Sequence, residues 1–233
     1  MLPVAILAGG RGTRLRPLTE TLPKSLVELN GEPFIAHQLR LLRESGIDRV
    51  VLCVGILGQM IADFVGNGKS FGLDVQYSFA GSELLGTAGA LKRALPVLGG
   101  QFFVLYGDSY LVCPYRDIEK SFLSCGKAAL MTVFRNEGKW GSSNVEYADG
   151  RILAYDKTRS TPRMHHIDYG LGVFLDCAFK SSPQQDLSGV YGDLINSQQL
   201  VAFEVHERFY EIGSPEGLAE TATFIRSRRG GQR

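Results

Sequence analysis

The chain has 233 residues, 44% of them hydrophobic, which is enough for one domain with a substantial buried core. Its 25 Lys and Arg residues nearly balance its 24 Asp and Glu residues, so no overall field favours nucleic acid or an anionic membrane as a partner. No stretch approaches the roughly 20 apolar residues of a membrane span, and the N-terminus lacks a basic region followed by an apolar run. We therefore expect a soluble cytoplasmic protein whose four cysteines, none in Cys-x-x-Cys spacing, are free thiols.

The first half of the chain alternates between strand and helix patterns. Val4 to Leu7 is an apolar run closed by glycines, as in a buried strand that feeds a loop at its carboxyl end. Further helices are predicted at 33–45, 59–65 and 87–95, and further strands at 49–54, 73–77 and 101–106. This alternation predicts a parallel sheet with helices on both faces.

The second half is strand-rich from Lys127 onward. Strands are predicted at 128–134, 143–147, 152–155 and 170–175, and Asp149-Gly150 between two alternating runs is a hairpin signal. We expect an α/β fold with a three-layer, doubly wound, mostly parallel sheet and a strand-rich insertion from the second half.

A glycine-rich segment follows the first strand. Gly9, Gly10 and Gly12 lack a Cβ, so backbone N–H groups can approach a phosphate closely, and Arg11, Arg14, Arg16 and Lys24 supply positive charge nearby. The Walker A pattern and the third glycine of the dinucleotide fingerprint are both absent, which weighs against a kinase, an ATPase or a dehydrogenase. Taken alone, the glycines are equally typical of an ordinary strand-to-loop turn.

The wider segment from Leu7 to Thr19, together with Pro23-Lys24, resembles the signature of the sugar-1-phosphate nucleotidyltransferases. Further segments resemble later motifs of that family and occur in the same order: Leu85 to Ala90, Gly107-Asp108, Tyr155-Asp156-Lys157, Tyr169-Gly170 and Glu211 to Gly217. The resemblance implies a glycosyltransferase-A-like α/β fold. The length and the element pattern predict a single domain over 1–233, with a nucleotide-binding part at 1–125 and an acceptor-binding part at 126–225, and the basic, glycine-rich end predicts a flexible tail at 226–233.

The same resemblance implies roles for individual residues. Arg14, Lys24 and Asp108 would be catalytic, because the first two bind and activate a nucleoside triphosphate and Asp108 holds Mg²⁺. The nucleotide would contact Leu7, Ala8, Gly9, Gly10, Gly12, Thr13, Arg14, Lys24, Glu83, Gly86 and Thr87. The sugar 1-phosphate would contact Gly107, Asn144, Asp156, Lys157, Tyr169 and Gly170, with Lys157 on its phosphate and Tyr169 against its ring.

The reaction brings two anionic substrates together, so a divalent cation held by carboxylates is expected. Asp108 directly follows a predicted strand. Glu211 is the candidate second ligand, at a place where the family usually has Asp, and the alternative is that it caps the helix beginning near Pro215. No general base is required, because a phosphate monoester is already anionic near neutrality.

The nucleobase and the acceptor stay open. Ala80 stands where relatives often carry a Gln or Glu that pairs with the base, which leaves Glu83 or backbone N–H groups at the helix start after Leu85 to read it. Hexose and heptose 1-phosphates both fit as acceptors. One alternative is a cytidylyltransferase acting on phosphocholine, with Trp140, Tyr155 and Tyr169 as an aromatic cage. A second alternative is a non-catalytic nucleotide-binding regulator, and homo-oligomer formation is also left open.

Overall fold

The computed structural model describes residues 1–10, 12–180 and 182–230. Arg11 of the glycine-rich segment and residues 231–233 of the expected tail therefore lie outside the described residues. The first part of that tail, 226–230, is helical, because it continues the last helix of the chain.

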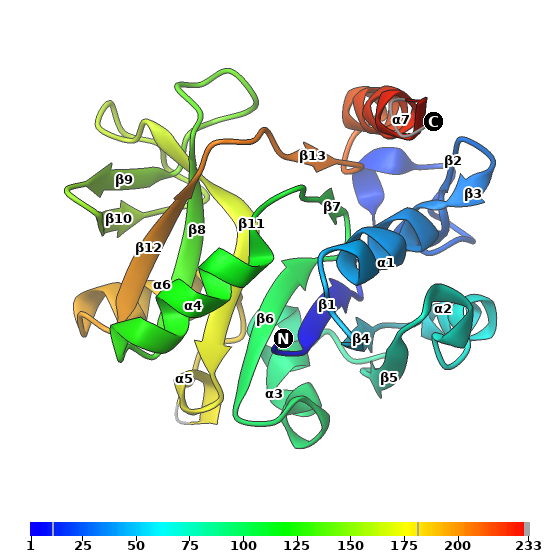
Figure 1. The fold of residues 1–233 in the computed structure, drawn as a ribbon, viewed down its shortest axis with the longest axis horizontal. Coiled ribbons are helices and arrows are strands. Elements are labelled where there is room, and N and C mark those ends of the chain that lie inside the picture. The colour runs from blue at the N-terminus through cyan, green and yellow to red at the C-terminus, as the bar shows by residue number, and fades with distance from the viewer. Residues whose placement is uncertain (11, 181, 231–233) are drawn as a thin grey trace.

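A nine-stranded sheet runs through the molecule (Figure 1). Four of its strands are parallel neighbours, in the spatial order β6-β1-β4-β5: β1 (Val4–Ala8), β4 (Arg49–Val54), β5 (Asp74–Phe79) and β6 (Gln101–Tyr106). Their apolar, β-branched sequences suit strands that are buried on both faces. Because the four strands run the same way, their carboxyl ends meet at one edge of the sheet.

The strand direction changes at β11 (His166–Leu175), which pairs antiparallel with β6. Beyond β11 the sheet forks into the hairpin β9–β10 and the pair β8–β12, whose bounds are β8 (Ala129–Arg135), β9 (Val145–Ala148), β10 (Arg151–Tyr155) and β12 (Leu200–Val205). Asp149 and Gly150 form the predicted hairpin turn, with φ angles of 48° and 75°. Parallel pairing is thus confined to β6-β1-β4-β5 and to β8–β12.

Helices cover both faces of the sheet. One layer contains α1 (Phe34–Glu44), α2 (Gly58–Val65) and α4 (Tyr115–Cys125), and the other contains α3 (Gly86–Leu98), α5 (Cys177–Lys180) and α6 (Leu187–Asn196). Successive side chains of a strand point to opposite faces, so Val50 and Leu52 pack in the first core while Val51 and Cys53 pack in the second. The expected three-layer α/β fold is confirmed.

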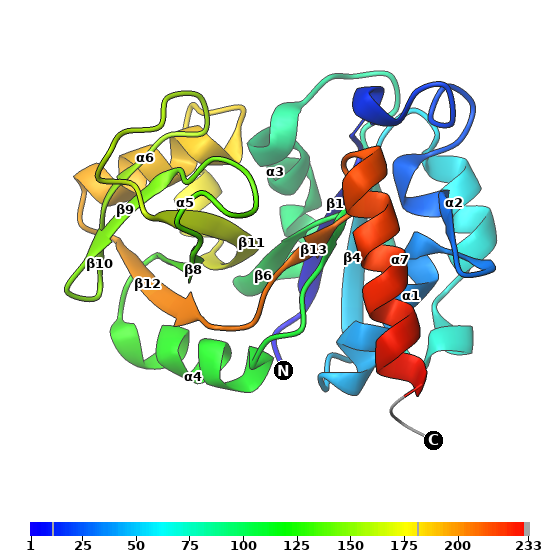
Figure 2. The same cartoon turned by 90° about the horizontal axis from the view of Figure 1, so that it is seen from above.

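The C-terminal helix α7 (Pro215–Gly230) lies beside α1 and the hairpin β2–β3, as Figures 1 and 2 show. Ion pairs fix it there, from Arg228 to Glu44 at 3.2 Å and from Arg229 to Glu32 at 3.4 Å. The remaining short elements of the chain are η1 (Thr13–Leu15), η2 (Lys24–Leu26), β2 (Glu28–Leu29), β3 (Glu32–Pro33), η3 (Lys69–Phe71), β7 (Ser109–Tyr110) and β13 (Tyr210–Glu211). A small third core, which includes Leu15, Phe34, Ile212 and Ile225, joins both ends of the chain.

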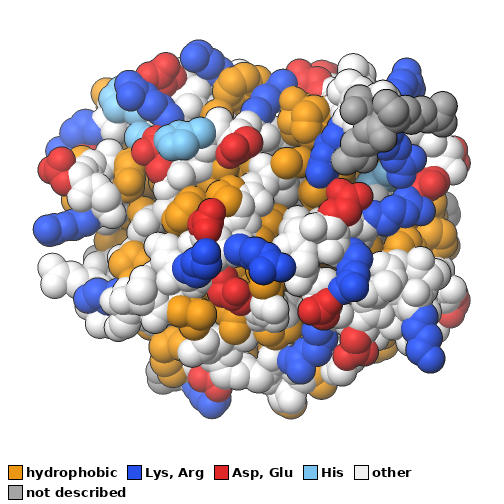
Figure 3. Space-filling model, in the orientation of Figure 1, with side chains coloured by type: hydrophobic (Ala, Val, Ile, Leu, Met, Phe, Trp, Pro, Cys, Tyr) orange, Lys and Arg blue, Asp and Glu red, His pale blue; other side chains and the backbone are white. Residues whose placement is uncertain are grey.

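Positive and negative side chains are mixed on the molecular surface. On the face shown in Figure 3, Lys and Arg side chains are interspersed with Asp and Glu, in line with the near balance of charge. Within the described ranges, no helix combines the length and the apolar character that crossing a membrane requires.

Candidate functional site

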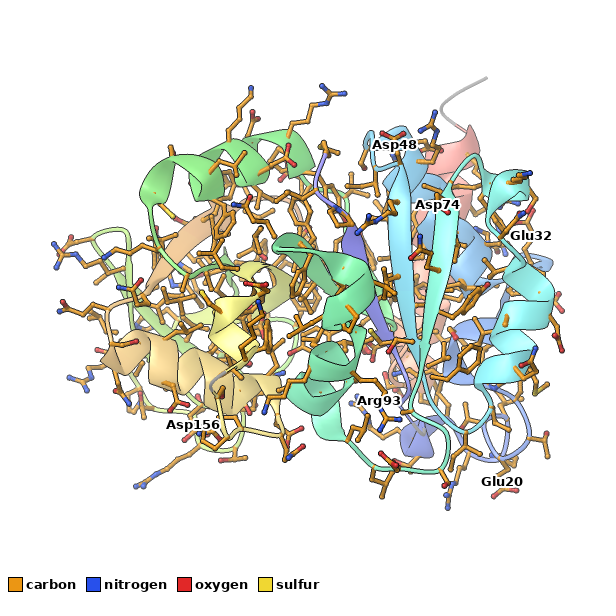
Figure 4. The ribbon with its side chains drawn as sticks, turned by 90° about the horizontal axis from the view of Figure 1, so that it is seen from below. Glu20, Glu32, Asp48, Asp74, Arg93 and Asp156 are labelled. Carbon is orange, nitrogen blue, oxygen red and sulfur yellow. The ribbon has the colours of Figure 1, made fainter. Side chains whose placement is uncertain are left out.

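A cavity of about 440 Å³ lies at the carboxyl edge of the parallel strands. In Figure 4 this edge carries Arg93, while Asp48 and Asp74, which stand at the amino ends of β4 and β5, lie at the opposite edge. The cavity brings together many of the predicted residues: Leu7, Ala8, Gly9, Gly10, Gly12, Lys24, Glu83, Gly86, Thr87, Gly107 and Asp108. A second hollow of about 390 Å³ shares Gly9 and Gly10 with this cavity.

The glycine-rich loop has one position that needs glycine for its conformation and one that leaves open space. Gly12 has a φ of 58°, and a Cβ on it would lie 3.2 Å from the Cβ of Lys24. Thr19 fixes the turn by donating its hydroxyl to the Gly12 carbonyl over 2.7 Å. At Gly10 no atom of the described residues, its chain neighbours aside, lies within 4 Å of where a Cβ would be, so the backbone there is open to a ligand.

Lys24 and Asp108 form an ion pair at this loop, with 2.6 Å between Nζ and Oδ2. Their side chains are 14% and 30% exposed, so both remain accessible from the cavity. Asp108 follows β6 with only Gly107 between them, and Gly107 permits the close packing there, since a Cβ on Gly107 would lie 2.6 Å from the carbonyl oxygen of Leu7. The pair places a cation and a carboxylate beside the open glycine backbone.

Gln38, a residue with no predicted role, holds the turn that carries Asp108. It is buried in α1, and its Nε2 donates to the carbonyls of Ser109 at 2.8 Å and Tyr106 at 3.2 Å. Both carbonyls flank Gly107-Asp108. The signal for this role was present in the sequence, because Gln38 is a polar residue within the apolar stripe of a predicted helix.

Glu211 and Arg14 lie together at the start of α7. β13 pairs with β7, and the N–H of Ile212 donates to the carbonyl of Asp108 over 2.9 Å, so the backbones of Glu211 and Asp108 are neighbours. The Glu211 carboxylate, however, accepts the N–H of Gly213, and a Cβ on Gly213 would lie 2.8 Å from the Arg14 guanidinium. Arg14, Thr13 and Glu211 are absent from the residues that line the cavity. Glu211 thus braces the turn before α7, while Ser214 caps the helix by accepting the N–H of Gly217 over 3.0 Å. The role of Glu211 as a metal ligand stays a prediction.

No group of three or more His, Cys, Asp or Glu side chains in the described residues is arranged to hold a metal ion. A cation at Asp108 would therefore need oxygen atoms from the substrates as well. That donor set, one or two carboxylates and several phosphate oxygens, suits Mg²⁺.

The expected base-reading end contains a residue that the sequence did not reveal. Arg93 of α3 pairs with Glu83 at 2.5 Å and donates to the carbonyls of Phe79 at 3.2 Å and Ala80 at 3.4 Å. Both Arg93 and Glu83 line the cavity. The guanidinium thus orders the segment around Ala80, where the expected base-pairing side chain is missing.

At the start of α3, three backbone N–H groups that were expected to be available to a ligand have partners within the protein. The N–H groups of Ala88 and Gly89 both donate to the carbonyl of Gln185, over 2.8 and 3.1 Å, and the N–H of Thr87 donates to the Asp186 carboxylate. These three groups are already paired within the protein. The expectation that they read a base edge is therefore corrected.

Lys157, the lysine predicted to bind the acceptor, lies beside Tyr106. Lys157 Nζ donates to the Tyr106 hydroxyl over 2.7 Å and lies 3.9 Å from the Asp168 carboxylate. Tyr155 donates its hydroxyl to Asp168 over 2.9 Å. Burial raises the pKa of Tyr106 well above its ordinary value, and the charges of Asp168 and Asp108 raise it further, so this phenol stays neutral.

The other predicted acceptor residues have structural partners. Asn144 accepts the N–H of Asp168 over 2.9 Å, and Asp156 accepts three bonds from Thr158 and Arg159, which lower the pKa of its carboxyl. Gly170 has a φ of 100° where β11 meets β7. The binding roles of these residues stay predictions.

Tyr169 differs from its expected role. It is only 2% exposed, and its ring packs against Phe134 and Phe209 in the core. Neighbouring residues of a strand point to opposite faces, so Asp168 and Gly170 lie on the side of the site while Tyr169 points away from it. The expectation that its ring packs against an acceptor is therefore wrong.

The aromatic cage considered for phosphocholine is also not formed. Trp140 packs against Phe134, and the Arg208 guanidinium lies 4.7 Å from its ring centroid. Tyr155 instead packs on Tyr191. The three rings do not enclose a common space, because Tyr169 belongs to the core.

The amino-acid sequence is similar to those of known nucleotidyltransferases. Residues 4–142 match the model of the family described as Nucleotidyl transferase. An N-acetylmuramate alpha-1-phosphate uridylyltransferase from Neisseria meningitidis is 44% identical over 104 residues, 44% of this chain and 45% of that protein. A mannose-1-phosphate guanyltransferase beta-B from Xenopus laevis is 30% identical over 220 residues, 91% of this chain and 61% of that protein. The chain thus spans about half to three fifths of the length of these curated relatives.

A solved structure of a proposed glucose-1-phosphate thymidylyltransferase from Bacillus anthracis, in complex with sucrose, has a TM-score of 0.85 to this chain. The match covers 97% of this chain and 96% of that one at 19% identity, and it shows a shared fold. The family match includes the glycine-rich loop, Lys24 and the turn at Asp108. This chain therefore belongs to the nucleotidyl transferase family, and the family resemblance of its opening signature is confirmed.

Proposed function

We propose that this chain transfers a nucleotidyl group from a nucleoside triphosphate to a sugar 1-phosphate, a hexose or a heptose, and releases pyrophosphate. The observation that carries the proposal is the presence of two lysines at the end of β6. Lys24 pairs with Asp108 at the glycine-rich loop, and Lys157 donates to the Tyr106 hydroxyl. Two separate cations around one turn suit a reaction between two phosphates.

The roles of the residues follow from this arrangement. The open backbone at Gly10 and the ammonium of Lys24 bind the triphosphate, and Arg14 supplies further positive charge near them. Lys157 holds the phosphate of the acceptor. An oxygen of that phosphate attacks the α-phosphorus, a new P–O bond forms, and the bond to the bridging oxygen breaks as pyrophosphate leaves with the electron pair. The acceptor is already ionised near neutral pH, so no side chain has to remove a proton.

We further propose Mg²⁺ as the cofactor. Asp108 would hold it, with Glu211 as the second ligand, and it would neutralise charge on the α-phosphate during transfer. The partly exposed Asp108 carboxylate beside the glycine-rich loop supports this assignment.

The names of the three similar proteins specify uridylyl, guanyl and thymidylyl transfer. They therefore do not agree on a base for this chain. We propose that the segment ordered by the Glu83–Arg93 pair contacts the base, because both side chains line the cavity. The free thiols of Cys53, Cys113, Cys125 and Cys177 are compatible with a reducing, cytoplasmic setting, which we also propose.

Pyrophosphate release is the decisive measurement. The purified protein, with Mg²⁺, is combined in turn with ATP, CTP, GTP, UTP and dTTP, and with glucose, mannose, N-acetylglucosamine and heptose 1-phosphates or phosphocholine. We expect release with at least one sugar 1-phosphate, and release at least about a hundredfold slower from Lys24→Met. Release with phosphocholine alone would replace the proposed acceptor. Tight binding of a triphosphate without any release would make the protein a regulator.

A further inference from the structure

Asp168 is a buried carboxylate beside the proposed acceptor site, and neither the predicted chemistry nor the family signature assigns it a role. Its side chain is only 4% exposed. It accepts the hydroxyl of Tyr155 at 2.9 Å and the N–H of Gly170 at 3.0 Å, and its own N–H donates to Asn144. A carboxylate this deeply buried is costly unless hydrogen bonds and an opposite charge compensate for it.

The opposite charge comes from Lys157, whose Nζ lies 3.9 Å from the Asp168 carboxylate. This separation is too long for a hydrogen bond but short enough for strong electrostatic attraction. The one hydrogen bond that Lys157 donates within the described residues goes to Tyr106. An ammonium has three N–H donors, so two remain for a ligand.

The rings of Tyr106 and Tyr155 restrict where this ammonium can lie. Nζ is 4.5 Å from the centroid of the Tyr106 ring and 6.0 Å from that of the Tyr155 ring. Burial raises the pKa of Tyr155, so its phenol keeps the proton that it donates to Asp168. Three neighbouring segments thus fix one cation: β11 supplies Asp168, β10 supplies Tyr155 and β6 supplies Tyr106.

We propose that Asp168 is a positioning residue, which acts through Tyr155 and Lys157 to hold the Lys157 ammonium ready for the phosphate of the acceptor. The inference rests on the proposed function, since it concerns the acceptor half of that same site. Asp168 does not touch the acceptor itself. It keeps a long, half-exposed lysine side chain, 40% accessible to solvent, from moving away from the cavity edge.

A purely structural role for Asp168 is the alternative to be tested. The pairing of β11 with β8 shifts register between Asp168 and Gly172, and the bond to the Gly170 N–H helps to form that irregularity. Asp168→Asn keeps the shape and an acceptor oxygen but removes the charge. Tyr155→Phe keeps the charge but removes the link to Asp168.

The experiment compares both variants with the wild type in two measurements. One is steady-state pyrophosphate release, and the other is calorimetric binding of the sugar 1-phosphate that is the best acceptor. Mannose 1-phosphate is used for binding if no acceptor reacts. Asp176→Asn is the matched control, because Asp176 directly follows β11, pairs with Lys180 at 2.6 Å and lies at the other end of the strand. We expect the acceptor KM to rise about tenfold in Asp168→Asn and several-fold in Tyr155→Phe, with the triphosphate KM within twofold of wild type. The control should leave both constants unchanged.

Each outcome decides between the two proposals. An unchanged acceptor KM in both variants overturns the positioning role and leaves the proposed function standing. A rise in the triphosphate KM equal to the rise in the acceptor KM has the same two consequences. If the wild type shows no turnover but the variants bind mannose 1-phosphate more weakly than it does, the positioning role of Asp168 is supported and the proposed function fails. Absence of both turnover and binding in the wild type overturns both. If Asp168→Asn does not fold, Tyr155→Phe alone decides by the same criteria.

Discussion

Lys24 Nζ lies 2.6 Å from Asp108 Oδ2, although 84 residues separate the two in the chain. Their proximity follows from the parallel pairing of β1 with β6, because Lys24 belongs to the loop after β1 and Asp108 to the turn after β6. In the described structure, each side chain balances the charge of the other. A triphosphate would give Lys24 a stronger anionic partner, so the ion pair links the phosphate site to the proposed metal site.

Replacing Lys24 by Met is expected to lower kcat by about 10²- to 10³-fold, since an ammonium aimed at the developing phosphate charge is lost. The ion pair is partly exposed, so the fold should be affected little. Steady-state pyrophosphate release and thermal melting measure the two effects. Lys120→Met is the control, because Lys120 is 76% exposed and pairs with Asp117 on α4. Wild-type kcat in Lys24→Met would remove Lys24 from the chemistry.

The sequence predicted both residues for the site, Lys24 through the family resemblance and Asp108 also through its place after a predicted strand. Parallel strands bring their carboxyl ends to one edge of a sheet, and Asp108 was expected at that edge. The alternation of strand and helix patterns likewise predicted helices on both faces of the sheet. These features required no knowledge of distant packing.

Other parts of the site depend on contacts that no local pattern specifies. Arg93 reaches the carbonyls of Phe79 and Ala80 from α3, and Gln185 pairs with the first N–H groups of the same helix. Such contacts depend on how the loops pack across the sheet. Tyr169 was assigned to the wrong face because the motif that it belongs to was read without its orientation in β11.

Gln38→Leu is expected to lower kcat about tenfold with little change in acceptor KM. The substitution removes both hydrogen bonds to the carbonyls that flank Asp108, so the carboxylate is held less firmly. Loss of these bonds should also lower the free energy of unfolding by about 1–3 kcal/mol. Activity is therefore measured well below the melting temperature of the variant.

The control for this substitution is Gln59→Leu, which changes an exposed glutamine of α2 whose amide donates to Asp63. It should leave kcat unchanged. A destabilised Gln38→Leu with wild-type kcat would show that Gln38 serves the fold and has no influence on Asp108.

Glu211→Ala tests whether this residue is a metal ligand or only braces the turn before α7. As a ligand, its loss should raise the Mg²⁺ concentration for half-maximal activity at least about tenfold. As a residue that only accepts the Gly213 N–H, its loss should lower only the stability, by about 1 kcal/mol. Titration of activity with Mg²⁺ and urea unfolding separate the two effects. Glu216→Ala, an exposed change in the first turn of α7, is the control. An unchanged Mg²⁺ dependence rules out the ligand role.

His37 is expected to make stability fall with acid. It is 2% exposed in α1, and burial lowers its pKa below the ordinary value of 6.5, with the nearby charge of Arg229 lowering it further. The unfolded chain therefore binds a proton more readily than the folded protein does. The resulting loss of stability begins as the pH falls through about 6.5 and continues toward the lower folded pKa. Above pH 7, His37 is neutral in both states and contributes no pH dependence.

Urea unfolding at pH 7.5 and pH 5.5 measures this effect. Wild type should lose more stability between the two values than His37→Gln, whose amide cannot take up the proton. His206→Gln, at an exposed position after β12, should keep the wild-type difference. An equal loss in wild type and His37→Gln would mean that other groups cause the acid sensitivity. A smaller loss in His37→Gln would instead identify this histidine, which Arg229 contacts through Nδ1, as a source of acid sensitivity where α1 meets α7.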